Sequence, residues 1–60
     1  MTKVQDLETG DLVEWKGERR IIENVIVLRN GDVTVSYEYL DKNGYGVAEI
    51  ARDTEITVLD

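Results

Sequence analysis

The side chains that most often carry catalysis are missing from this sequence of 60 residues. It contains no His and no Cys, so the commonest general base and the strongest nucleophile are both absent. Among its acids, the expected strand pairing brings together Glu23 and Glu38. Two neighbouring carboxylates can share a proton, as in an acid–base dyad. A domain of this size has little room for a deep cleft around them, so we expect two solvated acids and no enzyme.

The segment Asp41–Gly46, DKNGYG, carries oxygen ligands at alternating positions. Asp41 and Asn43 are spaced as in calcium-binding loops, which also need a Glu further on and flanking helices. The next ligand position holds Tyr45, and no flanking helices are predicted. Because Asn-Gly by itself explains a tight turn, we expect a hairpin turn here, with neither a metal ion nor another cofactor.

Basic residues gather in only one segment, EWKGERR at residues 14–20. Glu14 and Glu18 interrupt its three cations, Lys16, Arg19 and Arg20, and Arg29 lies apart from them. Thirteen acidic residues against seven basic ones give a net charge of −6. Nucleic-acid affinity depends on neutralising phosphates with Lys and Arg, so we do not expect nucleic acid to be the partner.

The dipeptide Asn30-Gly31 joins two alternating apolar runs and predicts a β-hairpin. Both central residues of a type I′ turn need positive φ, which Asn and Gly tolerate best. The turn is expected to have two residues or to contain a bulge, and a two-residue loop would place Leu28 opposite Val33. The same register places Glu23 opposite Glu38, an unfavourable pairing of like charges, and a β-bulge near Glu23-Asn24 would relieve it.

The other β-type segments are shorter than this hairpin. They occupy residues 10–15, 47–51 and 55–59, with a tight turn at 52–54 before the last one. Together with the hairpin they predict an all-β protein, a small five-stranded antiparallel barrel. The chain has no Pro, no low-complexity run and no repeat, so residues 1–60 are expected to form a single domain.

The N-terminal segment TKVQDLETGD has mixed polarity, and no long apolar stretch follows it. Neither a signal peptide nor a membrane span is predicted. We therefore expect a cytoplasmic protein with no membrane partner.

Three segments together resemble the small SH3-like barrels, the group that includes Tudor, chromo-like and KOW modules. They are LETGDLVEW at residues 7–15, the long bent strand pair with its tight turn, and ARDTEITVL at 51–59. The resemblance extends over most of the chain, through generic features such as a Gly-Asp, alternating Val and a terminal apolar strand. It implies an SH3-like fold and leaves the function open.

The aromatic residues have two possible roles. In the Tudor and chromo-like modules that this chain resembles, aromatic side chains at the barrel mouth form a cage for a methylated Lys or Arg. Trp15 is expected in the core, because a small barrel needs one large apolar residue. Tyr37 and Tyr39 fit either the core or a cage, and Tyr45, in a turn, is expected to be an exposed contact residue. Glu38 or Asp41 would supply the carboxylate of a cage.

The strand Ile21–Leu28 is apolar on both faces, and such a strand is normally covered on both sides. The expected alternation places Val25 and Val27 on a second face together with Ile21 and Leu40. An exposed apolar strip of this kind marks a partner site. The partner would be a second copy of this chain or a different protein.

These observations favour a noncatalytic protein-interaction module. Its acidic surface would suit an inhibitor or regulator that occupies a basic surface of its partner. The alternative is Tudor-like or KOW-like recognition of a methylated cationic ligand, or of nucleic acid, through an aromatic strand face. The candidate binding residues are Val25, Val27, Tyr37, Glu38, Tyr39, Leu40 and Tyr45.

Overall fold

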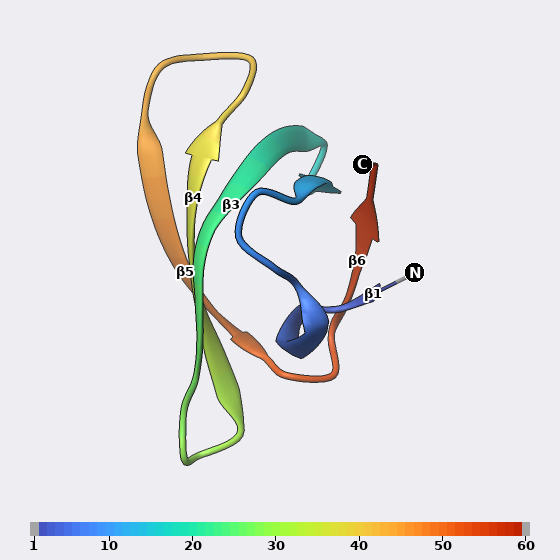
Figure 1. Cartoon of the computed structure of the whole chain (residues 1–60), viewed down its shortest axis with the longest axis vertical. Coiled ribbons are helices and arrows are strands. Elements are labelled where there is room, and N and C mark those ends of the chain that lie inside the picture. Colours follow the sequence, from blue (N-terminus) through green and yellow to red (C-terminus); the bar gives the residue numbers. More distant parts are fainter. Residues whose placement is uncertain (1, 60) are drawn as a thin grey trace.

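The computed structural model describes residues 2–59, which form one antiparallel sheet of six strands. The elements are β1 (Thr2–Lys3), the 3₁₀ turn η1 (Val4–Asp6), β2 (Leu12–Trp15), β3 (Glu18–Val27), β4 (Asp32–Tyr39), β5 (Tyr45–Ala51) and β6 (Glu55–Val58). The strand order is β1-β6-β2-β3-β4-β5, so β1 and β5 lie at the two ends of the sheet (Figure 1).

The expected all-β class is confirmed, but the expected count of five strands is wrong. The additional strand is β1, which pairs with β6 through Thr2 opposite Ile56 and Lys3 opposite Glu55. A strand of two residues leaves no alternation in the sequence from which to infer it. The sheet is also not closed, because no strand of the described chain joins β5 to β1.

The hairpin at Asn30-Gly31 joins the two longest strands, as predicted, but through a larger loop. The N–H of Gly31 donates to the Leu28 carbonyl at 3.2 Å, and the N–H of Leu28 donates to the Asp32 carbonyl at 2.8 Å. Gly31 has φ +93°, the left-handed conformation that ends a four-residue turn with a bulge. Val27 therefore pairs with Val33, and the register expected from a two-residue loop is wrong by one residue.

A second irregularity confirms the predicted bulge and changes which side chains share a face. The β3–β4 register shifts between Ile22 and Asn24, so Glu23 has no partner in the pairing and Glu38 lies opposite Ile21. No Glu23–Glu38 carboxylate pair exists.

The register set by the turn moves the valines of β3 to the other face. Val25 pairs with Val35 and Val27 with Val33, both buried residues of β4. Val25 and Val27 thus lie on the inner face, and the predicted strip that joined them to Ile21 and Leu40 does not form one surface. Val25 packs at the edge of the core, and Val27 is 55% exposed near the hairpin tip.

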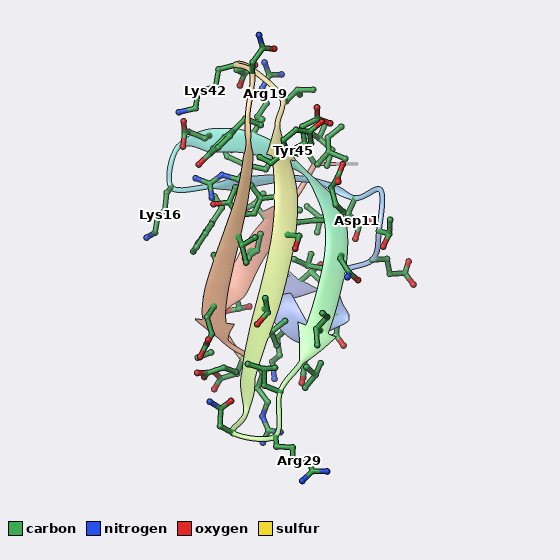
Figure 2. All side chains as sticks on the ribbon, turned by 90° about the vertical axis from the view of Figure 1, so that its left-hand side faces the viewer. Asp11, Lys16, Arg19, Arg29, Lys42 and Tyr45 are labelled. Atoms are coloured by element: carbon green, nitrogen blue, oxygen red, sulfur yellow. The ribbon has the colours of Figure 1, made fainter. Side chains whose placement is uncertain are left out.

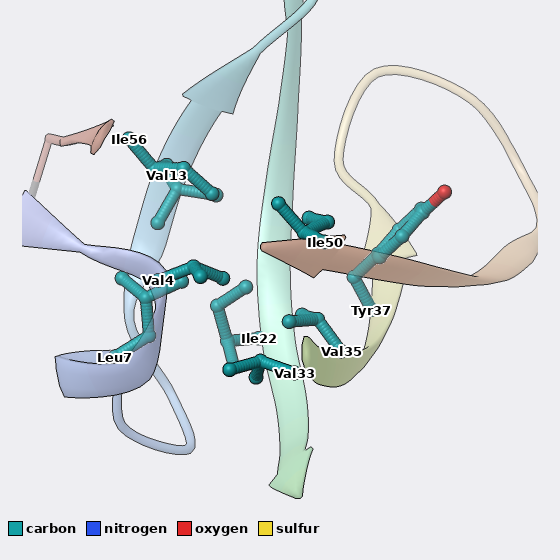
Figure 3. Packing of buried hydrophobic residues seen from close by; sticks show 9 residues of the cluster. All are labelled: Val4, Leu7, Val13, Ile22, Val33, Val35, Tyr37, Ile50 and Ile56. Atoms are coloured by element: carbon teal, nitrogen blue, oxygen red, sulfur yellow. The ribbon is translucent and has the colours of Figure 1, made fainter. Parts of the chain in front are cut away.

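The core lies between the inner face of β3, β4 and β5 and the elements opposite it, η1, β2 and β6 (Figures 1 and 3). Alternate residues of β4 contribute the centre of this core, as period-two patterning requires. The buried apolar residues are Val4, Leu7, Val13, Ile22, Val33, Val35, Tyr37, Ile50 and Ile56. Over residues 2–59, none of the elements is a helix of the length and hydrophobicity that crossing a membrane requires.

Candidate functional site

The inner face carries an aromatic cluster whose centre is occupied by Arg20. The guanidinium carbon of Arg20 lies 4.9 Å from the ring centroid of Trp15, 4.6 Å from that of Tyr37 and 5.1 Å from that of Tyr39. The two tyrosine rings meet edge to face, with centroids 5.4 Å apart. Arg20 is only 4% exposed, so its charge is largely removed from water and its cation–π contacts are strengthened.

Glu18 and Lys42 complete the polar side of this cluster. Arg20 Nη2 donates to Glu18 Oε1 at 2.9 Å, and Lys42 Nζ lies 2.8 Å from Glu18 Oε2. The hydrogen bond from Lys42, aided by Arg20, lowers the pKa of Glu18 below its usual range. Burial raises the pKa of Tyr37, and the neighbouring Tyr39 side chain adds to this shift.

This arrangement places two predicted binding residues, Tyr37 and Tyr39, around a cation that belongs to the protein itself. Tyr37 is a core residue, 8% exposed, and Tyr39 is partly buried against the core. The position that a methylated ligand would take in an aromatic cage is filled by Arg20. Arg20 is consequently not part of an exposed basic patch with Lys16 and Arg19.

The outer face of β3, β4 and β5 carries the other predicted residues. Ile21, Glu38 and Tyr45 lie side by side in one row across the three strands. In the next row, Val47 of β5 lies opposite Ser36 of β4. Tyr45 is 74% exposed and Val47 68% exposed, and Figure 2 shows Tyr45 projecting from this face. We call Ile21, Glu38, Leu40, Tyr45 and Val47 the outer patch.

A hollow of about 360 Å³ lies at the end of the outer patch. Its lining residues are Ile21, Glu38, Tyr39, Leu40, Asp41, Lys42 and Asn43. The loop that forms one wall is held in place by Arg19, which makes two hydrogen bonds to the Asp41 carboxylate and accepts the Leu40 N–H at its carbonyl, 3.0 Å away. The Arg19 guanidinium holds the pKa of Asp41 below its usual range. The hollow is therefore preformed and is bounded by apolar, acidic and basic groups.

The outer face of β4 and β5 is acidic without any compensating base. These two strands contain three charged residues, Asp32, Glu38 and Glu49, and no Lys or Arg. All three alternate with buried or inward-facing residues and therefore lie on the outer face. The neighbouring Asp32 carboxylate raises the pKa of Glu49, because two carboxylates close together disfavour carrying two negative charges.

The structure thus divides the predicted binding residues between two faces. Glu38, Leu40 and Tyr45 come together on the outer face, whereas the two other tyrosines and the two valines lie on the inner one. Sequence reasoning missed Val47 as a surface residue and Arg20 as the centre of the aromatic cluster. Period-two counting from Tyr45 would have found Val47, because both lie on the same side of one strand.

Neither a metal centre nor a similar protein helps to define this site. Within residues 2–59, no three or more acidic side chains are grouped so that they would hold a metal ion. Comparison of the chain with protein-family models, with curated proteins and with solved structures gives no match.

Proposed function

We propose that this chain is a noncatalytic protein-interaction module of the SH3-like type, which binds a partner protein through the outer patch. The observation that carries the proposal is the exposure of large apolar side chains in neighbouring rows of one sheet face. Tyr45, Val47 and Leu40 are 74%, 68% and 43% exposed. Small monomeric proteins rarely leave contiguous apolar surface of this kind uncovered unless it binds something.

The order of the strands supports the SH3-like part of the proposal. A long bulged strand, β3, pairs with both β2 and β4, and β6 returns after a short turn to pair with β2. Small SH3-like barrels have this meander with a closing strand. The outer patch lies on the hairpin strands and is independent of whether the sheet closes.

The acidic outer face indicates what kind of partner would fit. Glu38 lies within the outer patch between Ile21 and Tyr45, and no base of β4 or β5 neutralises it. A partner with an apolar anchor beside a Lys or Arg would complement both properties. A protein of this kind would act as an inhibitor or regulator when the basic surface it covers has another use.

The Tudor-like or KOW-like alternative is less well supported. Arg20 already occupies the space among Trp15, Tyr37 and Tyr39, so a methylated ligand would have to displace a buried cation. The acidic outer face would repel phosphates, which opposes binding of nucleic acid there. The interaction module therefore accounts for more of the exposed residues.

Affinity capture with matched variants tests the proposal. Proteins retained by the immobilised chain would be identified, and their affinities measured by titration with the wild type, with Leu40→Ser and Tyr45→Ser combined, and with Val27→Ser. Truncating anchor residues of an interface commonly weakens binding by about tenfold or more, so the outer-patch variant should lose the partner. Val27 is equally apolar and 55% exposed but lies on the inner face, so its variant should retain the partner. If the Val27→Ser variant lost the partner and the outer-patch variant retained it, the assignment of the binding site to the outer patch would be contradicted.

A further inference from the structure

The strand β5 has one edge that the described chain leaves unpaired. β5 is the last strand in the sheet order, and its other edge pairs with β4. Figure 1 shows no strand beside β5 on the side away from β4, and η1 comes near only at the C-terminal end, where the Gln5 N–H donates to the Arg52 carbonyl at 3.3 Å. The backbone groups on that side are therefore available to another polypeptide.

The hydrogen bonds at the two ends of the β4–β5 pair show which groups these are. The N–H of Tyr39 donates to the Gly44 carbonyl at 3.0 Å, and the N–H of Arg52 donates to the Gly31 carbonyl at 3.2 Å. Bonded positions recur at every second residue of an antiparallel pair. Gly44 and Arg52 are separated by an even number of residues, so both bonds agree on which positions are bonded. The β5 residues bonded to β4 are Gly46, Ala48 and Ile50. The backbone N–H and C=O groups directed to the free edge are those of Tyr45, Val47 and Glu49, together with the N–H of Ala51, whose carbonyl already accepts the Thr54 N–H at 3.0 Å.

This edge has few of the features with which proteins usually prevent strand addition. Such features are a very short strand, charged side chains, a Pro on the edge, or a bulge, and β5 has only the charge of Glu49. β5 has seven residues, contains no Lys and no Pro, and pairs with β4 without a register shift. At the opposite end of the sheet, β1 has only two residues. The sheet therefore presents one edge long enough to bind a strand.

The same three residues also determine the chemistry beside the edge. Their side chains lie on the outer face, two of them apolar and the third, Glu49, acidic. Asp32 lies diagonally across from Glu49 on the same face, because Asp32 pairs with Ala51 and Thr34 with Glu49. A cationic side chain placed opposite Glu49 would relieve the repulsion between these two carboxylates.

We propose that the free edge of β5 binds an extended segment of a basic partner protein as an added antiparallel strand. A Lys or Arg of that segment lies opposite Glu49, and apolar side chains lie opposite Val47 and Tyr45. The proposal deepens the proposed function and rests on it, because the added strand would extend the outer patch. A second copy of this chain fits the edge less well, since it would bring its own Glu49 and a second net charge of −6.

A designed peptide provides a direct test with the whole chain. The probe is the capped peptide Lys-Thr-Val-Thr-Val-Thr-Lys, in which the first Lys would face Glu49, and its control replaces both Lys with Glu. In NMR titrations of the isotope-labelled chain, saturating probe should slow amide exchange at Tyr45, Val47 and Glu49 by about tenfold or more. The amides of Gly46 and Ala48, already bonded to β4, should change little. The proposal would be overturned if the Glu peptide bound as tightly as the Lys peptide. It would also be overturned if the same three amides were already protected without peptide because the chain associates with itself.

Two variants separate strand addition from ordinary contact with the outer patch. Val47→Pro removes an edge-facing N–H at a position where an edge strand tolerates Pro, and it should weaken peptide binding about tenfold. Glu49→Lys should weaken the Lys peptide about two- to fivefold and strengthen the Glu peptide, whereas Glu55→Lys, an exposed acid on β6, should do neither. Strand addition would be refuted if a folded Val47→Pro variant bound the Lys peptide as tightly as the wild type does. It would also be refuted if Glu49→Lys did not weaken binding of the Lys peptide and strengthen binding of the Glu peptide. If the captured partner still depends on Leu40 and Tyr45 in that case, the interaction function stands without it.

Discussion

Replacing Arg20 by Ala removes the cation around which the inner-face aromatic residues are arranged. Its guanidinium lies 4.6–5.1 Å from three ring centroids and is 4% exposed. A desolvated cation contributes roughly 0.5–2 kcal/mol per aromatic contact, and three rings sharing one cation contribute less than three times that amount. We expect Arg20→Ala to lower the free energy of unfolding by about 2–4 kcal/mol, part of which is lost packing of the side-chain stem. For a 60-residue domain this is a large share of the total stability.

Arg19 provides a matched control one residue away. It projects to the opposite side of β3, its side chain is 52% exposed, and its partner is the exposed Asp41. Exposed ion pairs contribute little to stability, so Arg19→Ala should shift the unfolding midpoint far less. Urea titrations followed by the fluorescence of Trp15 would compare the two variants, and the indole emission of Arg20→Ala should move to longer wavelength. Equal midpoints for the two variants would refute the view that Arg20 is a structural cation.

Two further predictions concern the same cluster. A Cβ on Gly46 would lie 2.5–2.6 Å from atoms of the Tyr37 side chain, whose movement Arg20 restricts. Gly46→Ala should therefore destabilise the fold by about 1–3 kcal/mol. Thermal unfolding would compare the effect of Gly46→Ala in the wild type and in Tyr37→Ala, where the destabilisation should disappear because the ring is absent. Because the pKa of Glu18 is lowered in the folded state, its stabilising contribution is complete above the unfolded value of about 4.3 and is lost as the pH falls through the folded value. Urea midpoints measured across that acidic range should fall less steeply for Glu18→Gln than for the wild type, and an identical pH dependence would contradict this role of Glu18.

The sequence predicts the irregular points of this sheet better than its faces. Asn30-Gly31 indicates the hairpin because few other residues accept positive φ. In the structure Gly31 has φ +93° but Asn30 does not have positive φ, so the hairpin is confirmed and its expected type I′ conformation is wrong. The bulge is predicted near Glu23-Asn24, and the structure has it between Ile22 and Asn24. The reason given for it is wrong, because in the observed register, where Val27 pairs with Val33, a regular strand would place Glu23 opposite Tyr37 and not opposite Glu38.

The face on which each side chain of β3 lies depends on the number of residues in the turn, and a difference of one residue reverses it. The same Asn-Gly suits a two-residue turn and a longer turn that ends in a glycine bulge. A shift of one residue moves every side chain of a strand to the other side, and this shift places Val25 and Val27 on the inner face. For this reason the predicted binding strip does not form. Glu38, Leu40 and Tyr45 lie together on the outer face, because β4 pairs with β5 without a register shift.

The position of Arg20 could not be inferred from residue types, because arginine is usually exposed. It occupies the inner position of β3 opposite Tyr39, where alternation alone would call for an apolar residue. Its charge is tolerated because three rings and Glu18 surround it, although its Nε has no hydrogen-bond partner among the described residues. One of the seven basic residues is thereby withdrawn from the surface.

The withdrawal of Arg20 increases the contrast between the two faces of the hairpin strands. The two cations near the outer patch, Arg19 and Lys42, are also held in ion pairs, with Asp41 and Glu18. Glu38 and Glu49 lie on a face where β4 and β5 supply no base. A protein partner would therefore meet apolar side chains, uncompensated carboxylates and a free strand edge on the same part of the sheet. An extended basic segment satisfies all three at once, whereas a nucleic acid is repelled by the carboxylates and a methylated side chain finds the aromatic cluster already occupied.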